Sequence, residues 1–250
     1  MHAVTEVLEP GEIPLWRHPE WVERFPWLVQ GVTGRDGPGD ETGFGLFGPT
    51  PVGVALDRWR RLRATTALPA AVHSRQVHGD RVEEWPLPLP SGLMVTEGAD
   101  AHVTRQPGIL LTVSVADCVP VFLVAGSPRA VAMVHAGWRG VAAGVFERAF
   151  AALVGMGAIP SEVHAHCGPA ICGECYEVGP EVHEAVRPGP GVFVKAPIDL
   201  RAALAQRAAD VGMSRERFTT STHCTLHGSE FFSHRGGSTG RQVGVIGIRP

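Results

Sequence analysis

The stretch RAVAMVHAGWRGVAAGVFERAFAALVGMG, residues 129–157, decides the fold class. Its first part is a run of apolar residues ending at Val134, which is typical of a buried strand. The small-residue segment AGWRG predicts a turn, and a helical pattern of apolar residues begins around Val141. A strand that leads into a helix is the building unit of α/β proteins. His135 is therefore expected at the carboxyl end of a strand, the edge where such proteins usually assemble their sites.

Upstream, residues 109–124 read ILLTVSVADCVPVFLV, an apolar run interrupted by a carboxylate and a thiol. ILLTVSV and VPVFLV each predict a buried strand, and Pro120 fits an abrupt join between them. Cys118 alone would be an ordinary small buried side chain. The adjacent Asp117 is harder to explain by packing, because a buried carboxylate costs several kcal/mol unless it is paired or binds a metal.

Other elements are predicted on both sides of this region. Residues 55–68 predict an amphipathic helix whose buried stripe consists of Leu56, Trp59, Leu62 and Leu68. Residues 199–211 predict another helix with Asp199 as its N-cap. The chain closes with the strand QVGVIGI. Because no repeat, low-complexity tract or linker divides the 250 residues, the sequence predicts one α/β domain with mixed strands.

Composition and charge exclude several classes of protein. A hydrophobic share of 44% is normal for a globular chain, and a net charge of −3 gives no basic footprint for nucleic acid. The N-terminus has no basic segment followed by an apolar one, so we expect no secretory signal and a cytoplasmic protein. Residues 109–126 are apolar, but the Asp and Pro at their centre argue against a membrane span. Composition therefore favours small molecules over nucleic acid or a membrane as partners, and no protein partner is evident.

Three residues with metal-binding side chains fall at the ends of, or between, predicted strands: His78, Cys118 and His135. Two imidazoles and a thiolate suit zinc or copper, and three protein ligands leave a position open for water or substrate. Their spacing matches no short ligand motif. From the residues alone, a core cysteine and two hydrogen-bonded histidines remain an equal alternative.

A competing set of cysteines occurs further along the chain. Cys167, Cys172 and Cys175 have the spacing of plant-type ferredoxin ligands, and Cys224 is available as a fourth. The residues GPAI between the first two fit a strand end that leads into a helix better than a loop wrapped around a cluster. An iron–sulfur centre is therefore the weaker hypothesis.

Six short motifs in order resemble the laccase-domain family, whose members were first described as multicopper polyphenol oxidoreductases and later as purine nucleoside phosphorylases. They are RQVHG (75–79), ADAHVT (99–104), ADCVPV (116–121), VHAGWRG (134–140), GPAICGECYEVGPEV (168–182) and FFSHRGGSTGR (231–241). The resemblance covers roughly residues 30–248.

This resemblance implies a fold and a metal site. The fold would be a single α/β domain of the α/β/β/α type, with mixed sheets between helical layers, formed by residues 30–250 after an N-terminal segment 1–29. The metal ligands would be His78, Cys118 and His135, holding Zn²⁺ or, alternatively, Cu²⁺. The resemblance leaves Cys167 and Cys172 without a special role.

The resemblance also implies an activity. The enzyme would cleave adenosine, inosine, guanosine and 5′-methylthioadenosine with phosphate, releasing the base and ribose 1-phosphate, with adenosine deaminase as a further activity. One rival is copper-dependent oxidation of phenols. Another is a metal-free cysteine hydrolase or deamidase with Cys118 as nucleophile and His135 as base. A non-catalytic metal-binding protein is the third.

Further site residues follow from these chemistries. Phosphate binding suits the guanidinium groups of Arg139, Arg235 and Arg241, each of which has a surface ion pair as its alternative role. Asp117 is a candidate to orient a ligand histidine, to cap its turn or to transfer a proton. Trp138 is a candidate either to stack on a purine or to pack in the core.

Overall fold

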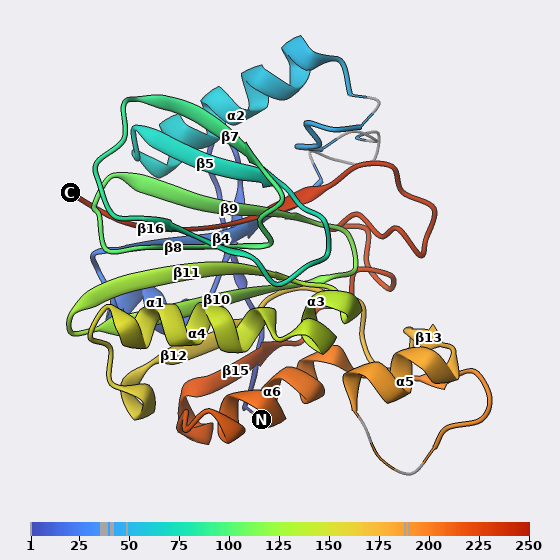
Figure 1. Ribbon diagram of the computed structural model, residues 1–250. Coiled ribbons are helices and arrows are strands. Elements are labelled where there is room, and N and C mark those ends of the chain that lie inside the picture. Colours follow the sequence, from blue (N-terminus) through green and yellow to red (C-terminus); the bar gives the residue numbers. More distant parts are fainter. Residues whose placement is uncertain (1, 36–39, 41–42, 49, 188, 190) are drawn as a thin grey trace.

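Two seven-stranded sheets packed face to face form the centre of the protein, and helices cover both outer faces (Figure 1). This computed structural model describes residues 2–35, 40, 43–48, 50–187, 189 and 191–250. Sheet A has the order β1 (His2–Val4), β15 (Phe218–Ser221), β12 (His164–Cys167), β10 (Val119–Gly126), β11 (Arg129–Ala136), β8 (Ala101–Thr104) and β6 (Val82–Trp85). Sheet B has the order β2 (Val7–Glu9), β3 (Leu15–Arg17), β4 (Leu28–Thr33), β16 (Gln242–Ile248), β9 (Ile109–Val115), β5 (Ala70–Arg75) and β7 (Gly92–Glu97).

The described residues form six α-helices. They are α1 (Pro19–Arg24), α2 (Val52–Thr66), α3 (Trp138–Ala143), α4 (Val145–Gly155), α5 (Pro180–Val186) and α6 (Leu200–Asp210). Helix α2 covers sheet B, whereas α3, α4 and α6 cover sheet A (Figure 1). Two strands, β13 (Glu177–Val178) and β14 (Ala196–Pro197), form a separate ladder near α5. No helix among these elements is long and apolar enough to cross a membrane.

Three hydrophobic cores fill the three spaces between the layers. The core between the sheets includes Val113, Phe122 and Met133, and the core between sheet A and its helices includes Val121 and Phe146. The third lies between α2 and sheet B, around Trp59 and Val245. Because strand side chains alternate between faces, a strand that is buried on both faces must be apolar throughout. This explains the unbroken apolar runs in the sequence.

The expected mixed α/β domain with paired sheets between helices is confirmed, but two local predictions are wrong. Leu56 is 50% exposed, and Ala55 takes its place on the buried stripe of α2, which passes through Trp59 and Leu62 as expected. The segment AGWRG is no turn: β11 runs on to Ala136 and α3 begins at Trp138. A single residue, Gly137, suffices to join them because its extended backbone caps the helix directly.

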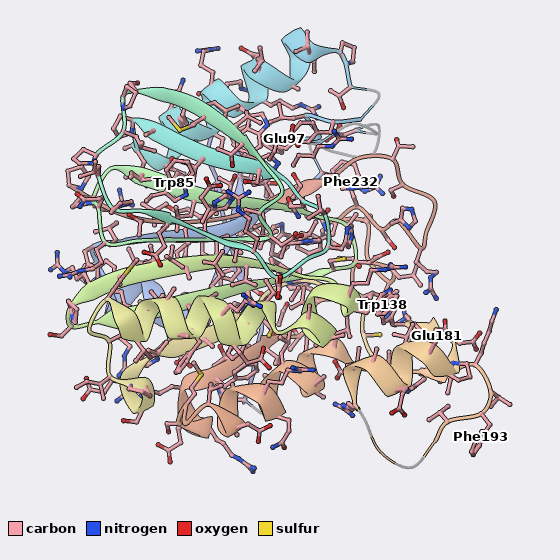
Figure 2. The ribbon with its side chains drawn as sticks, in the orientation of Figure 1. Trp85, Glu97, Trp138, Glu181, Phe193 and Phe232 are labelled. Carbon is pink, nitrogen blue, oxygen red and sulfur yellow. The ribbon has the colours of Figure 1, made fainter. Side chains whose placement is uncertain are left out.

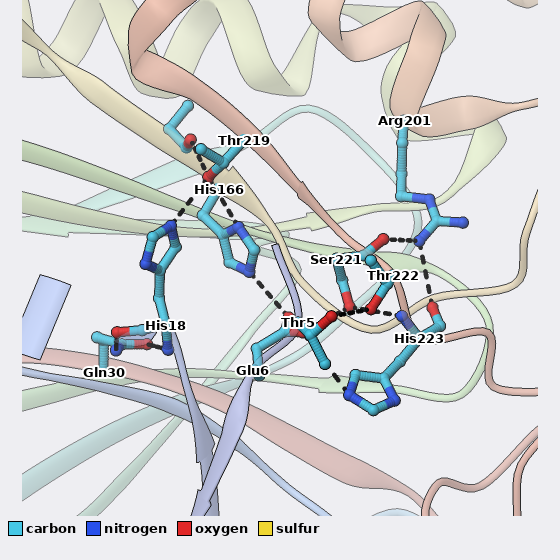
Figure 3. A network of polar contacts seen from close by, with 11 residues as sticks. Thr5, Glu6, His18, Gln30, His166, Arg201, Thr219, Ser221, Thr222 and His223 are labelled. Atoms are coloured by element: carbon cyan, nitrogen blue, oxygen red, sulfur yellow. Dashed lines mark hydrogen bonds and ion pairs between the residues drawn. The ribbon is translucent and has the colours of Figure 1, made fainter. Parts of the chain in front are cut away.

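The first residues of the chain are tied into sheet A by a buried polar network, shown in Figure 3. Glu6 is only 3% exposed. Its carboxylate accepts from His166 Nε2 at 2.9 Å and from Ser221 Oγ at 2.8 Å. His166 Nδ1 in turn lies 2.9 Å from Thr219 Oγ1. The network joins the chain start to β12 and β15, so residues 2–9 form part of the sandwich.

Three chain crossings from sheet B to sheet A occur at one end of the sandwich. They follow β5, β7 and β9 and lead into β6, β8 and β10, respectively. His78 lies in the first crossing, Asp100 in the second and Cys118 in the third. The crossings therefore gather polar side chains at the open end of an otherwise apolar interlayer space.

Candidate metal centre

The imidazoles of His78 and His135 and the thiol of Cys118 lie together at the end of the sandwich where the three crossings lead from sheet B to sheet A. The ligand atoms of His78, Cys118 and His135 all lie within 4.8 Å of one another. His135 stands on the face of β11 that carries Val131 and Met133 into the space between the sheets. The rings of His78 and His135 have centroids 4.8 Å apart, at an interplanar angle of 76°. His135 is buried, Cys118 is half-buried and His78 is exposed, so the group is open to solvent on the His78 side.

Asp100 holds both histidines in place. Its Oδ1 lies 2.8 Å from His135 Nδ1 and accepts the amide N–H of His78 at 2.9 Å. Its Oδ2 accepts the amides of Val77 and Gly79 at 3.1 and 2.8 Å. With Nδ1 of His135 engaged, Nε2 remains for a metal, which is the usual arrangement of a metal-binding histidine. Asp100 lies in the motif ADAHVT but was not predicted as a site residue.

The backbone at the site is constrained. His78 has φ of 59° and Asp117 has φ of 88°, both in the left-handed region that residues other than glycine rarely adopt. A Cβ added to Gly137 would lie 3.0 Å from Cys118 Sγ and 3.0 Å from His78 Cδ2. A side chain at position 137 would thus intrude between two of the candidate ligands. Left-handed conformations at residues other than glycine concentrate at functional sites.

The thiol and the buried imidazole favour opposite charges. Although burial opposes ionisation, His135 and then His78 lower the pKa of Cys118 to about 6. Burial also opposes the charge of His135, but Cys118 and Asp100 raise its pKa to about 9. Near neutral pH these groups favour a thiolate beside an imidazolium when no metal is bound. A thiolate is the form of cysteine that binds metals and attacks electrophiles.

Asp117 is bonded to loops from other parts of the chain. Its Oδ1 accepts from Thr225 Oγ1 at 2.6 Å, and its Oδ2 accepts the amide of Arg235 at 2.6 Å. Its carbonyl oxygen accepts the amide of Ile171 at 3.1 Å. The carboxylate partner of His135 is Asp100, so Asp117 does not take the histidine-orienting role among the described contacts. Asp117 instead ties the turn that carries Cys118 to its surroundings.

The three candidate arginines have different settings. Arg139 is exposed and lies over the Trp138 ring, with its guanidinium carbon 4.2 Å from the ring centroid. Arg235 is exposed and lies 5.2 Å from the centroid of Tyr176. Burial and the nearby Cys118 raise the pKa of the Tyr176 hydroxyl to about 12, and the charges of Arg235 and Arg139 oppose this shift. Arg241 instead donates to the carbonyls of its own loop at Thr239 and Gly240.

Trp138 is partly buried at the start of α3. It packs against the core between sheet A and its helices. Figure 2 shows it near the end of the molecule where α5 lies, above and to the left of Glu181 of α5. Of the two roles expected for Trp138, the contacts in the structure are those of a packing residue that also carries Arg139 on its ring.

A second group of possible metal ligands differs from the set that cysteine spacing suggested. Cys172, Cys175 and Cys224 lie together with His227, their ligand atoms all within 4.8 Å of one another. Cys167 is not among them, because it is fully buried in β12 and packs in the core under the helices. Burial raises the pKa of the Cys167 thiol far above its ordinary value.

Comparison with known proteins places the chain in a family. Residues 50–249 match the family model described as multi-copper polyphenol oxidoreductase laccase. The chain belongs to this laccase family. Its fold agrees with that assignment, because YlmD from Geobacillus stearothermophilus superposes with a TM-score of 0.87 at 28% identity, over 98% of this chain and 100% of that one.

Relatives within the laccase family carry enzyme names. The chain is 35% identical to a purine nucleoside phosphorylase of Streptomyces griseus over 210 residues, covering 81% of this chain and 84% of the relative. It is also 34% identical to an adenosine deaminase from an unknown prokaryotic organism over 198 residues, covering 74% of this chain and 72% of the relative. The resemblance expected from the six motifs is thereby confirmed.

Proposed function

We propose that the protein is a zinc-dependent purine nucleoside phosphorylase. It would cleave adenosine, inosine, guanosine and 5′-methylthioadenosine with phosphate to the free base and ribose 1-phosphate, and would also deaminate adenosine. The observation that carries the proposal is that the ligand atoms of His78, Cys118 and His135 lie within 4.8 Å of one another at the open end of the sandwich. The enzyme names of its relatives in the laccase family support it.

The donor set fits zinc. Two imidazoles and a thiolate with close ligand atoms are suitable for this ion, and three protein ligands are typical of catalytic rather than structural zinc sites. Zinc bound by these residues would supply electrostatic stabilisation of charge that develops on the purine and its substituents. In this proposal, Asp100 holds His135 in the ring orientation and tautomer that leave Nε2 free.

Phosphate binding is assigned to Arg139 and Arg235. Both are exposed near Tyr176 and Cys118, and a guanidinium group binds phosphate through two parallel hydrogen bonds. Arg241 is the weaker candidate, since its guanidinium group donates to two carbonyls of its own loop, whereas that of Arg235 donates to one carbonyl, that of Glu177 at 3.1 Å. Asp117 would fix the positions of Cys118 and Arg235 relative to each other, because it is adjacent to Cys118 and accepts the amide N–H of Arg235.

The test is to incubate zinc-loaded protein with adenosine, with and without phosphate, and to separate adenine, hypoxanthine, inosine and ribose 1-phosphate. Adenine that forms only with phosphate is the expected result, and inosine that forms without phosphate would demonstrate the deaminase activity. Cys118→Ala, purified in parallel, should abolish both activities and so excludes contaminating host enzymes. Cys167→Ala is the matched control, because that thiol lies in the core of β12.

Two other functions make different predictions in the same assay. A cysteine hydrolase is favoured by the lowered pKa of Cys118, and its activity would survive a chelator that removes zinc. A phenol oxidase would need copper and would leave nucleosides intact. If the protein fully loaded with zinc forms no nucleoside product while either of these activities is present, the phosphorylase assignment is wrong.

A further inference from the structure

Four ligand side chains lie together on two loops that the proposed reaction does not use. Cys172 and Cys175 form a Cys-x2-Cys pair, and Cys224 and His227 form a Cys-x2-His pair about fifty residues later. Their ligand atoms are all within 4.8 Å of one another. Pairs of this kind, contributed by two loops, are typical of closed zinc sites.

The backbone brings the two loops together. Strands β12 and β15 are parallel neighbours in sheet A, so the loops that follow them leave at the same edge. The pairing continues beyond the strands as an isolated parallel bridge between Ala170 and Cys224. The amide of Thr225 donates to the carbonyl of Ala170 at 3.1 Å. The approach of the four ligands therefore follows from the sheet itself.

Hydrogen bonds and short contacts connect the members of the group. The amide of Cys172 donates to Cys224 Sγ at 3.3 Å, and Cys175 Sγ lies 2.8 Å from His227 Nε2. The amides of Cys175 and Tyr176 both donate to the carbonyl of Cys172 at 3.1 Å, which closes the turn of the Cys-x2-Cys pair.

We propose that Cys172, Cys175, Cys224 and His227 bind a second zinc ion, whose role is structural. Zinc–sulfur bonds of about 2.3 Å put the sulfurs of a tetrahedral site about 3.8 Å apart, which is compatible with the observed limit of 4.8 Å. Four protein ligands close the coordination shell, so this site differs in kind from the three-ligand group around His135. An iron–sulfur cluster would need its ligand sulfurs spread further apart.

The second zinc would brace one wall of the candidate active site. The loop after β12 donates the amide of Ile171 to the Asp117 carbonyl, and the loop after β15 donates the Thr225 hydroxyl to the Asp117 carboxylate. Asp117 is adjacent to Cys118. A metal ion that joins the two loops would therefore fix the turn that carries Cys118. The two groups share no ligand, so this effect on His78, Cys118 and His135 would be indirect.

Metal analysis tests this proposal. Tag-free protein is produced with zinc and a thiol reductant, and its zinc, iron and acid-labile sulfide are measured. We expect about two zinc ions per wild-type chain, and about one in both Cys118→Ala and Cys175→Ser. Cys167→Ala should keep both, because its thiol lies outside both groups. A Cys175→Ser chain that keeps the wild-type zinc content, or iron and sulfide in place of zinc, overturns the proposal.

A second measurement covers the case in which Cys175→Ser does not fold. His227 is exposed, so His227→Asn removes one ligand with little effect on packing. Cys118→Ala, stripped of zinc, is titrated with Co²⁺ and should show thiolate–cobalt absorption that saturates at one equivalent. Cys118→Ala/His227→Asn should bind Co²⁺ at least tenfold more weakly. Absent thiolate–cobalt absorption, or equal affinity in the two proteins, overturns the second site, whatever the result at His78, Cys118 and His135.

Discussion

The carboxylate of Asp100 lies 2.8 Å from His135 Nδ1 and also accepts the backbone amides of residues 77–79. One buried side chain on the crossing before β8 thus sets both the orientation of one candidate ligand and the backbone of another. The position of His78, with φ of 59°, depends on this anchor.

Asp100→Asn should therefore damage the site more than its similar size suggests. An amide can accept fewer of these donors, and its own N–H groups face them, so buried donors lose their partners at a cost of about 1–3 kcal/mol in the free energy of unfolding. Zinc affinity or kcat/KM should fall by roughly 10–100-fold, as is usual for the partner of a ligand histidine. Both are measured by zinc competition titration and initial rates.

Asp80→Asn is the matched control for that experiment. Asp80 lies two residues after His78 in the first crossing, but it pairs with Arg148 at 2.8 Å near the surface. It should leave zinc affinity unchanged. Equal losses in the two variants would show that removing a carboxylate charge near the site, and not breaking the Asp100–His135 bond, accounts for the effect.

Gly137→Ala should loosen the site while the fold persists. The new Cβ would lie 3.0 Å from Cys118 Sγ, closer than ordinary contacts, so the thiol or the His78 ring must move. We expect at least tenfold weaker zinc binding, with a far-ultraviolet circular dichroism spectrum like that of the wild type. Gly155→Ala, at the end of α4 with open space around its Cβ, should bind zinc normally. Unchanged zinc affinity in Gly137→Ala would show that the ligands do not depend on this close approach.

In chelated protein, the alkylation of Cys118 should be half-maximal near pH 6, because the neighbouring imidazoles lower its pKa to about 6 against burial. The rate is followed with iodoacetamide and peptide mass spectrometry, and Cys118→Ala identifies the signal. His135→Gln should move the midpoint upward. A wild-type midpoint near the ordinary value of 9.0 would contradict the pairing of these groups.

The free energy of unfolding of the chelated protein should depend only weakly on pH between 6.5 and 9, although the alkylation rate of Cys118 changes with pH. The raised pKa of His135 contributes stability below pH 6.5 that is lost as the pH rises toward 9. The lowered pKa of Cys118 contributes stability above pH 9.0 that is lost as the pH falls toward 6. Between pH 6.5 and 9 these opposing slopes cancel, because the pair exchanges no net proton on unfolding. Urea unfolding at several pH values should therefore show only a small contribution from this pair.

Arg139→Ala and Arg235→Ala should each raise the KM for phosphate by roughly tenfold, which corresponds to about 1.4 kcal/mol. Their guanidinium groups lie in the neighbourhood of Tyr176 and Cys118, whereas that of Arg241 donates to its own loop. Arg241→Ala should change this KM by less than about twofold. Phosphate saturation curves at fixed adenosine give the comparison. A larger effect in Arg241→Ala than in the other two would reverse the assignment.

The strands were predictable because burial on both faces leaves a simple pattern. ILLTVSV, VPVFLV and QVGVIGI appear as β9, β10 and β16 because each faces a core on both sides. Leu56 shows the limit of this approach, because α2 covers only one sheet and Ala55 could take the buried position as easily. A stripe of small and large apolar residues does not by itself fix the rotation of a helix.

Asp100 and His227 show why the rest of the site could not be predicted. Each meets its partners through strand neighbours that are distant in sequence: Asp100 through the crossing into β8, and His227 through the pairing of β12 with β15. One local signal for Asp100 was available, since a carboxylate directly before the apolar strand AHVT needs a partner. Cysteine spacing alone grouped Cys167 with Cys172, although strand alternation turns Cys167 into the core.

Because the chain crosses between the sheets at the candidate site, the packing of the core between the sheets also affects the positions of the candidate ligands. His78 and Cys118 leave sheet B at their crossings, whereas His135 stands on sheet A, so the thickness of the sandwich sets the separation of the candidate ligands. The layers approach closely at Gly244, where an added Cβ would lie 2.9 Å from Met133 Cε and 3.1 Å from Pro120 Cβ. We therefore expect metal affinity at the candidate ligands to depend on the packing of the core between the sheets, so that a substitution at Gly244, away from the ligands, would change it.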